Sequence, residues 1–229
     1  LREYEAKERE EIRKILIRIT EIVRSRKEEI VPVKDILERL DFINAKVLYS
    51  VANDCRVPKI VNREYLKLVV ARHPLIEKEK MVPINFQLGD NENIMLITGP
   101  NTGGKTVTLK IAGLLTLMAL SGIPIPADEK TEIGFFNDVL ADIGDEQSIE
   151  QNLSSFSAHI KNIKEILETA TRRSLILIDE LGSGTDPMEG SAFAMSVIDY
   201  LNQKNVKSII TTHYSEVKAY AFNTEGIKS

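Results

Sequence analysis

The stretch that decides the fold is GPNTGGKT, whose residues are Gly99, Pro100, Asn101, Thr102, Gly103, Gly104, Lys105 and Thr106. It fits the pattern G-x-x-x-x-G-K-[ST] and lies between an apolar run typical of a strand and one typical of a helix. Glycines let the backbone wrap around phosphate oxygens, and N–H groups at the helix start face the anion. Lys105 adds positive charge near the β- and γ-phosphates, and Thr106 offers its hydroxyl to Mg²⁺. The sequence therefore predicts an ATP and Mg²⁺ site, with a ligand-free glycine turn as the less favoured interpretation.

Short apolar runs around this stretch predict buried strands. They are LKLVVA (66–71), IMLIT (94–98), SLILID (174–179) and SIITT (208–212). Helices are expected over residues 104–120, 154–171 and 187–203. Strands that alternate with helices indicate an α/β fold, here a P-loop NTPase with a mixed, largely parallel sheet flanked by helices. Loops with chemical roles should then follow the carboxyl ends of the strands.

Two acidic residues, Asp179 and Glu180, end one of the expected strands. Asp179 is suited to hold Mg²⁺ directly or through water, and Glu180 is suited to polarise an attacking water. This pair favours hydrolysis over binding alone, and a strand that merely ends in acidic residues is the alternative. Downstream, Asp186 and Pro187 are expected to cap and begin the next helix, a structural role.

His213 directly follows the expected strand 208–212. A single histidine is most often structural, but its position at a strand end favours a sensor of the γ-phosphate. His159 is expected to lie on a helix surface. His73 precedes Pro74 and has no such strand-end position.

The first part of the chain predicts long amphipathic helices. Apolar residues recur at intervals of three and four from Ile12 to Val23 and again from Val33 to Val51. Pro32 lies between the two stripes and predicts the turn of a helical hairpin. We expect a helical part over 1–56, most simply a structural hairpin that packs against its neighbour, and a globular part over 57–229.

Composition limits the classes of protein further. Hydrophobic residues make up 43% of 229 residues, enough for a core, and no apolar run reaches the roughly 20 residues of a membrane span. The net charge of −4 argues against nucleic-acid binding over the whole surface. A single cysteine, Cys55, fits a reducing compartment, so a cytoplasmic location is expected. The charged start without methionine favours an excised fragment.

Taken in order, the motifs closely resemble the ATPase domain of the MutS family, a branch of the ABC-type ATPases. RHPL (72–75) and ITGPNTGGKT (97–106) resemble that family's entry to the nucleotide site. DIGDEQSIEQNLSSFSAH (142–159) and DELGSGTDPMEG (179–190) resemble its second bacterial branch, which is associated with suppressing recombination. The resemblance covers 59–229, and the preceding helices are similar to the family's lever.

The resemblance implies further site residues. Ser154, Ser155 and Phe156 belong to a signature segment that reaches across a homodimer to the γ-phosphate held by the partner. Hydroxyls at a helix start are suited to this role. Met81 and Val82, with His73 nearby, match the segment on which adenine packs, although no aromatic residue occurs there. Gln147 matches a loop that contacts Mg²⁺ or the attacking water in ABC ATPases.

Departures from the family pattern sharpen the expectation. The signature reads Ser-Ser-Phe where many relatives have Ser-Thr-Phe, which keeps a hydroxyl. The mismatch-reading Phe-x-Glu motif does not occur in this sequence. The second branch also carries a C-terminal endonuclease module, and this chain ends before such a region. The resemblance implies ATP hydrolysis that drives clamp and lever movements on branched or duplex DNA, and for some members action on collided ribosomes, hence rRNA binding.

Two other P-loop classes stay open. A transporter nucleotide-binding subunit should carry Leu-Ser-Gly-Gly-Gln at the signature, where this chain has LSSFS. A chromosome-tethering ATPase of the SMC or Rad-fifty kind should place long heptad coiled coils after the P-loop lobe, and none occurs here. Both are less favoured than the MutS family.

Overall fold

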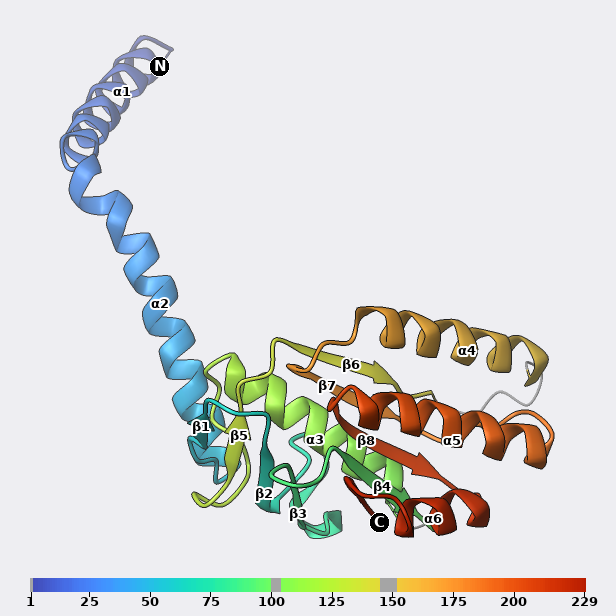
Figure 1. The fold of residues 1–229 in the computed structure, drawn as a ribbon. Coiled ribbons are helices and arrows are strands. Elements are labelled where there is room, and N and C mark those ends of the chain that lie inside the picture. Colours follow the sequence, from blue (N-terminus) through green and yellow to red (C-terminus); the bar gives the residue numbers. More distant parts are fainter. Residues whose placement is uncertain (1, 100–103, 145–151) are drawn as a thin grey trace. The chain divides into compact units, whose positions relative to one another are not determined.

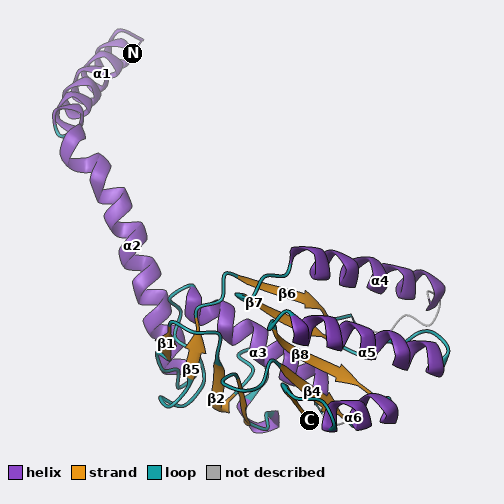
Figure 2. Cartoon of the chain, in the orientation of Figure 1, coloured by secondary structure: helices purple, strands orange, loops and turns teal. Residues whose placement is uncertain are grey.

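A computed structural model describes residues 2–99, 104–144 and 152–229, with the backbone alone for 152–156. The chain divides into two compact units, Leu1–Tyr49 and Ser50–Ser229. The first unit is helical, and the second contains the described strands (Figure 2). No helix in the described ranges combines the length and the apolar character that a membrane span needs.

The helical unit differs from the predicted hairpin in the position of its break. Helix α1 spans Arg2–Ser25 and helix α2 spans Lys27–Ala52, so the helices are separated at Arg26. Pro32 lies inside α2, and the prediction that it forms the turn is wrong. A proline close to the start of a helix removes one backbone hydrogen bond without ending the helix, and the apolar pattern continues past it.

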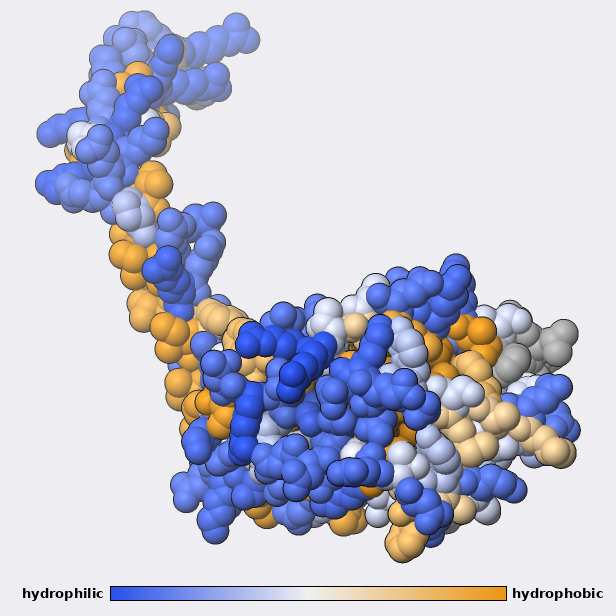
Figure 3. All heavy atoms as spheres, viewed as in Figure 1, coloured by the Kyte–Doolittle hydropathy of each residue, from blue (hydrophilic) through white to orange (hydrophobic). Residues whose placement is uncertain are grey.

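The apolar stripe of these helices is exposed. Neither α1 nor α2 contains a buried residue in the described part of the chain. Leu16 is 58% exposed and Leu37 is 59% exposed, and apolar side chains line one side of α2 in Figure 3. The helical period is therefore present as predicted, but the stripe is not buried within the unit.

The second unit contains two sheets. Their strands are β1 (Lys59–Val61), β2 (Leu66–Ala71), β3 (Ile84–Leu88), β4 (Ile94–Thr98), β5 (Glu132–Gly134), β6 (Asp138–Asp142), β7 (Ser174–Ile178), β8 (Lys207–Thr212) and β9 (Ile227–Lys228). The smaller sheet has the order β1-β5-β2-β3, with antiparallel pairs on both sides of β2. The larger sheet has the order β6-β7-β8-β4-β9, and all of its pairs are parallel.

Helices cover both faces of the parallel sheet. The helices of this unit are α3 (Lys105–Leu120), α4 (Asn152–Thr169), α5 (Pro187–Gln203), α6 (Ser215–Phe222) and the short 3₁₀ helix η1 (Lys78–Lys80). Helix α3 lies between the two sheets, and α4, α5 and α6 lie on the opposite face of the parallel sheet (Figure 1). The result is a layered α/β fold with one apolar core on each side of the larger sheet.

Strand β7 shows why the sequence specifies two cores. Leu175 and Leu177 face the core around α3, whereas Ile176 and Ile178 face the core under α4 and α5. All four side chains are buried, at 2% exposure or less. Burying each such side chain stabilises the fold by roughly 1.5–3 kcal/mol relative to exposure. A continuous apolar run is therefore required where both faces of a parallel strand are covered.

The predicted elements around the P-loop stretch are confirmed. Strands β2, β4, β7 and β8 and helices α3, α4 and α5 lie within two residues of their expected bounds. The prediction of a largely parallel sheet is also confirmed for the larger sheet. The sequence reasoning missed β1, β3, β5, β6, β9 and α6, and with them the existence of the smaller sheet.

Candidate active site

Three neighbouring strands bring the predicted site residues to one edge of the parallel sheet. The strand order places β8 between β7 and β4, with Thr98 paired to Thr212 and Ile178 paired to Ile210. Because the strands are parallel, their carboxyl ends share that edge. The P-loop stretch follows β4, the acidic pair follows β7, and His213 follows β8.

The described ends of the P-loop stretch have the backbone geometry that glycine allows. Gly99 has φ +142° and Gly104 has φ +77°, so both lie in conformations that other residues rarely adopt. Gly104 immediately precedes α3, whose first residue is Lys105. The Lys105 side chain is buried, and its ammonium donates to the carbonyl oxygen of Gly99. Residues 100–103, which include Pro100, Asn101, Thr102 and Gly103, lie outside the described residues.

Thr211 holds the acidic pair in place. Its hydroxyl donates to Oδ1 of Asp179 at 2.5 Å and accepts from the backbone N–H of Glu180 at 2.8 Å. Asp179 is 7% exposed and Thr211 is fully buried. One hydroxyl thus fixes both the carboxylate of Asp179 and the backbone of Glu180. The sequence reasoning gave Thr211 no role, although its place in β8 beside the end of β7 was a usable signal.

Glu180 itself has an unusual backbone. Its φ of +49° lies in the left-handed region, which costs a non-glycine residue roughly 1–2 kcal/mol. Such outliers cluster at functional sites, because the surrounding structure must hold them. The Thr211 contact to the Glu180 N–H is one part of that support.

Tyr214 fixes the loop that follows Glu180. Its buried hydroxyl donates to the carbonyl oxygen of Gly182 at 2.9 Å. A Cβ on Gly182 would lie 2.3 Å from the carbonyl oxygen of Gly190, so the loop and α5 approach too closely for any side chain. Burial raises the pKa of the Tyr214 hydroxyl, and the Asp186 carboxylate adds to that effect. The side chain of Asp186 accepts from the N–H of Met188 at 2.9 Å, which confirms the predicted helix cap.

His213 lies between two buried anchors. Thr212 and Tyr214 are both buried, whereas the His213 side chain is exposed at the strand edge. The imidazole ring lies beside the ring of Tyr214, with centroids 4.3 Å apart. The backbone is therefore fixed while the imidazole faces outward, an arrangement that suits contact with a ligand at this edge.

The residues expected near adenine lie in the segment between β2 and β3. Met81 is partly buried against the core around α3, and Val82 is 77% exposed. Burial lowers the pKa of His73, and the Lys110 ammonium on α3 lowers it further. His73 also accepts from the backbone N–H of Leu75 at 3.2 Å through its Nδ1.

The signature segment falls in the first turns of α4. Helix α4 begins at Asn152, and its backbone includes Ser154, Ser155 and Phe156. The side chains of these three residues lie outside the described part, as does Gln147 altogether. Their predicted roles stay predictions.

His159 lies on helix α4, as predicted, but its side chain is half-buried rather than fully on the surface. Its Nδ1 lies 2.8 Å from Oδ2 of Asp142, the last residue of β6, and its side chain is 32% exposed. Asn162 donates to the other carboxylate oxygen of Asp142 at 3.2 Å. The sequence does not predict this contact, because β6, which supplies the buried carboxylate, carries no periodic strand signal.

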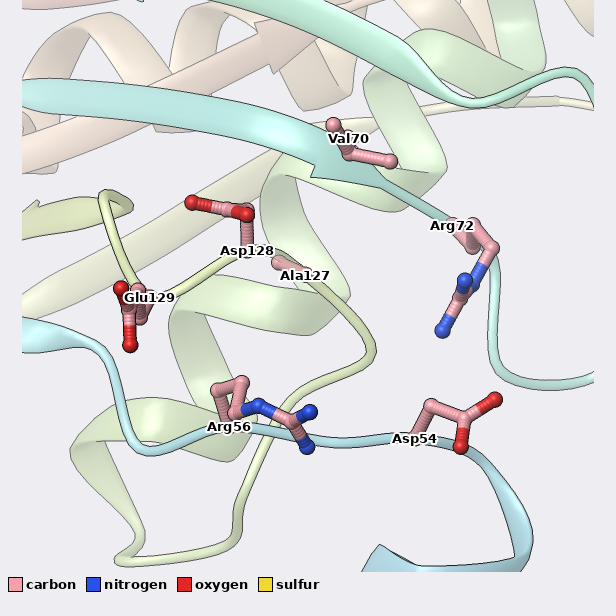
Figure 4. Close-up of a pocket in the computed structure, with 7 residues that line it drawn as sticks. All are labelled: Asp54, Arg56, Val70, Arg72, Ala127, Asp128 and Glu129. Carbon is pink, nitrogen blue, oxygen red and sulfur yellow. The ribbon is translucent and has the colours of Figure 1, made fainter.

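A separate surface pocket of about 300 Å³ lies away from these strand ends (Figure 4). Its lining residues are Asp54, Arg56, Val70, Arg72, Ala127, Asp128 and Glu129. Arg72 donates to the carbonyl oxygen of Asn53, and Asp54 is paired with Lys78 at 2.7 Å. The lining mixes both signs of charge and includes none of the residues predicted to bind the nucleotide.

Within the described ranges, no group of three or more His, Cys, Asp or Glu side chains is arranged to hold a metal ion. A Mg²⁺ ion in a P-loop site needs no such group, because a threonine hydroxyl, one carboxylate and phosphate oxygens supply its ligands. The Oδ1 atom of Asp179 is occupied by Thr211, and among the described residues no hydrogen bond to Oδ2 occurs. That oxygen suits a cation.

Comparison with known proteins gives the family. The family described as MutS domain V matches residues 95–229, more than half of the chain and all of the parallel sheet except Ile94. The chain belongs to the MutS family. This membership excludes the transporter and chromosome-tethering classes. Membership of this family also agrees with the order of the motifs along the chain, in which the P-loop stretch follows β4, the acidic pair follows β7 and His213 follows β8.

Several MutS relatives match along the whole chain. A Fusobacterium nucleatum protein named Endonuclease MutS2 is 64% identical over 229 residues. Proteins of the same name from Caldanaerobacter subterraneus and Finegoldia magna are 52% and 51% identical over 229 residues. In each case all of this chain is covered and 29% of the relative is covered. These names support the second bacterial branch, and the chain spans less than a third of such relatives.

Proposed function

We propose that this chain contains an ATP-hydrolysing domain, over residues 57–229, of a MutS-like DNA-binding protein. The observation that carries the proposal is the buried network at the end of β7, where Thr211 fixes Asp179 and Glu180 beside the P-loop strand. Residues 1–56 would form the helical lever that nucleotide state moves. Hydrolysis is favoured over binding because the second carboxylate directly follows the buried one.

The described residues suit a magnesium–nucleotide complex. Gly104 turns the chain so that the N-terminus of α3 faces the loop, and a helix N-terminus attracts anions. Lys105 places an ammonium next to Gly99, the last described residue before the loop. Thr106 and Oδ2 of Asp179 would hold Mg²⁺, which, when bound, neutralises charge on the phosphates.

Each remaining residue has a defined task in this proposal. Glu180 accepts a proton from the attacking water, and His213 donates a hydrogen bond toward the γ-phosphate. Met81 and Val82 pack on the base with His73 nearby. Gln147 orients the water or a metal ligand.

The proposed assembly is a homodimer with composite sites. Ser154, Ser155 and Phe156 at the start of α4 would complete the partner's site, since helix N-termini and hydroxyls stabilise phosphate charge. DNA, branched or duplex, would bind mainly through regions outside this chain, as would ribosomal RNA. The word endonuclease in the relatives' names would refer to a module outside the matched part, which is 29% of each relative. A protein with these partners would act in the cytoplasm.

Glu180→Gln tests the hydrolytic role. It should lower ATP turnover by about 10²–10⁴-fold, the usual contribution of a general base, while ATP binding persists. The matched control is Glu216→Gln, an exposed carboxylate in α6, which should turn over ATP at the wild-type rate. Wild-type turnover in Glu180→Gln would refute the role given to Glu180.

The same variant tests the dimer. With ATP trapped by Glu180→Gln, the full-length protein should elute from a sizing column as a dimer whose stability depends on ATP. A fully active protein that stays monomeric at all ATP concentrations would refute the composite site.

A further inference from the structure

The end of β6 carries a polar cluster that the nucleotide site does not use. Asp142 is 4% exposed, and both of its carboxylate oxygens accept hydrogen bonds from side chains of α4, one from His159 and one from Asn162. The histidine lies seventeen and the asparagine twenty residues along the chain from Asp142. A buried carboxylate satisfied from two sides is a strong and directional anchor.

The anchor is placed where α4 needs one. The apolar contacts of α4 with the core are made by Ile163 and Ile166, farther along the helix. Ser157 and Ala158, ahead of the histidine, are exposed. Among the side chains of α4 that the structure describes, His159 and Asn162 therefore attach the helix to β6 ahead of these apolar contacts.

The anchor is also close in sequence to the signature segment, Ser154, Ser155 and Phe156. Ser155 precedes His159 by four residues, about one helical turn. A shift of the His159 turn relative to β6 would move the first turn of α4 with it, because a helix transmits displacement rigidly along its axis. The ring of His159 also packs close to Gly144, where a Cβ would lie 3.1 Å from Cε1.

We propose that Asp142, His159 and Asn162 form a positioning cluster that sets where the start of α4 projects, and so acts on the nucleotide held by the partner subunit. The proposal rests on the proposed composite ATPase site. Nδ1–H of His159 donates to Oδ2 of Asp142, which fixes the imidazole and with it the helix. These residues do not touch the nucleotide; they position the residues that do.

The first test is a pair of substitutions at one position. His159→Ala removes the donor and should lower kcat by about tenfold to a hundredfold, the cost expected of a displacement near 1 Å, with KM for ATP within about twofold. His159→Asn places an amide N–H near the position of Nδ1 and should recover most of the lost kcat. A purely structural role would change stability in both variants without this difference in kcat, and wild-type kcat in folded His159→Ala would overturn the proposal.

Asn162→Ala is the second variant, because it removes the weaker donor and leaves the His159–Asp142 contact. It should lower kcat less than His159→Ala and keep the native circular dichroism spectrum. If His159→Ala fails to fold, Asn162→Ala and His159→Asn still test the cluster. Unchanged kcat in Asn162→Ala together with full loss in His159→Asn would contradict positioning by hydrogen bonds to Asp142.

Mixed dimers decide whether the cluster acts across the interface. His159→Ala and Glu180→Gln subunits, each poorly active alone, are unfolded, mixed in equal amounts and refolded as full-length protein. A mixed dimer has one site with a native Glu180 and a native α4, so random pairing should restore about a quarter of wild-type turnover. If mixed dimers form but turnover is not restored, the proposal is overturned. His159→Ala would then act on the site of its own subunit, to which the backbone hydrogen bond from Asp179 to Asp142 connects the cluster.

Two controls separate the failure of this inference from that of the proposed function. A mixture of Asp179→Asn and Glu180→Gln, which both damage the same half-site, should restore nothing. If the wild-type protein itself neither hydrolyses ATP nor dimerises, the proposed function fails. If it does both while His159→Ala is fully active, only the positioning cluster fails.

Discussion

Two neighbouring strands of the parallel sheet each lead to a buried aspartate. Strand β6 ends in Asp142, and Asp179 directly follows β7. The two carboxylates are held differently. Asp142 receives one hydrogen bond on each carboxylate oxygen from helix α4. Asp179 receives one from Thr211 on Oδ1, and no bond to Oδ2 occurs among the described residues. The backbone joins the two sites, since the N–H of Asp179 donates to the carbonyl oxygen of Asp142 at 2.9 Å.

This difference separates an anchor from a ligand. A carboxylate whose two oxygens both accept from side chains of one helix fixes that helix and stabilises packing. A carboxylate with an oxygen that accepts no hydrogen bond from the described residues, at the edge where β4 also ends, suits a cation. Burial alone, 4% against 7% exposure, would not have distinguished them.

The largest expected effect is at the end of β7. Asp179→Asn should lower ATP turnover by about 10³-fold or more, because the amide cannot supply an anionic ligand to Mg²⁺. Asp142→Asn keeps one acceptor oxygen for α4 and should lower turnover by about tenfold to a hundredfold. A steady-state ATPase assay on both variants checks the order. Equal losses would erase the distinction between anchor and ligand.

The next effect concerns the loop that follows Glu180. Gly182→Ala should lower the free energy of unfolding by about 3 kcal/mol, since it combines a left-handed φ of +89° with a Cβ that meets the backbone of Gly190. Gly122→Ala is the matched control: its φ is +71° and its Cβ would meet nothing within 4 Å, so it should lose only about 1 kcal/mol. Urea unfolding followed by circular dichroism measures both. Similar losses would mean that close approach to α5 does not constrain this loop.

Removal of the hydroxyl shared by Asp179 and Glu180 should have a smaller effect. Thr211→Val is similar in shape but leaves the Glu180 N–H without its acceptor, which should cost about 2 kcal/mol of stability. Thr211→Ser keeps the hydroxyl and should lose less. Thr169→Val, at an exposed hydroxyl of α4, serves as control. A Thr211→Val protein as stable as that control would show that the network contributes no net stability.

The smallest effect is expected at Tyr214. Tyr214→Phe removes one hydrogen bond to Gly182 and should cost about 1 kcal/mol at neutral pH. The folded-state pKa of Tyr214 is raised, so its contribution is complete below about pH 10 and is lost as the pH rises through the folded-state pKa. The variant should therefore lose stability less steeply in alkali than the wild type. An identical alkaline slope by thermal unfolding would contradict the burial of this hydroxyl.

The sequence was sufficient for the end of β7 but not for the end of β6. Strand β7 is SLILI, a continuous apolar run that burial on both faces requires, and Asp179 follows it directly. Strand β6 is DVLAD, whose aspartates at each end give no strand signal even though Asp142 is buried. Its pairing with β7 is a long-range contact that local periodicity does not encode. The contact of His159 with Asp142 is not predictable from the sequence for the same reason.

The helical unit shows the opposite error. The period of apolar residues correctly predicts helices, but Pro32 does not end one, since α2 continues through it. The shorter strands of the smaller sheet, such as β5 with three residues, carry too few residues for a periodic signal. The edge formed by β4, β7 and β8 was predictable because motif and strand coincide there.

The most direct test of the account is a magnesium titration of ATP binding by the Asp179→Asn and Asp142→Asn proteins, measured by calorimetry beside the wild type. The account predicts that Asp179→Asn loses the gain in ATP affinity that Mg²⁺ gives the wild type, whereas Asp142→Asn retains it. Retention in Asp179→Asn together with loss in Asp142→Asn would contradict the assignment of ligand and anchor to the two strand ends.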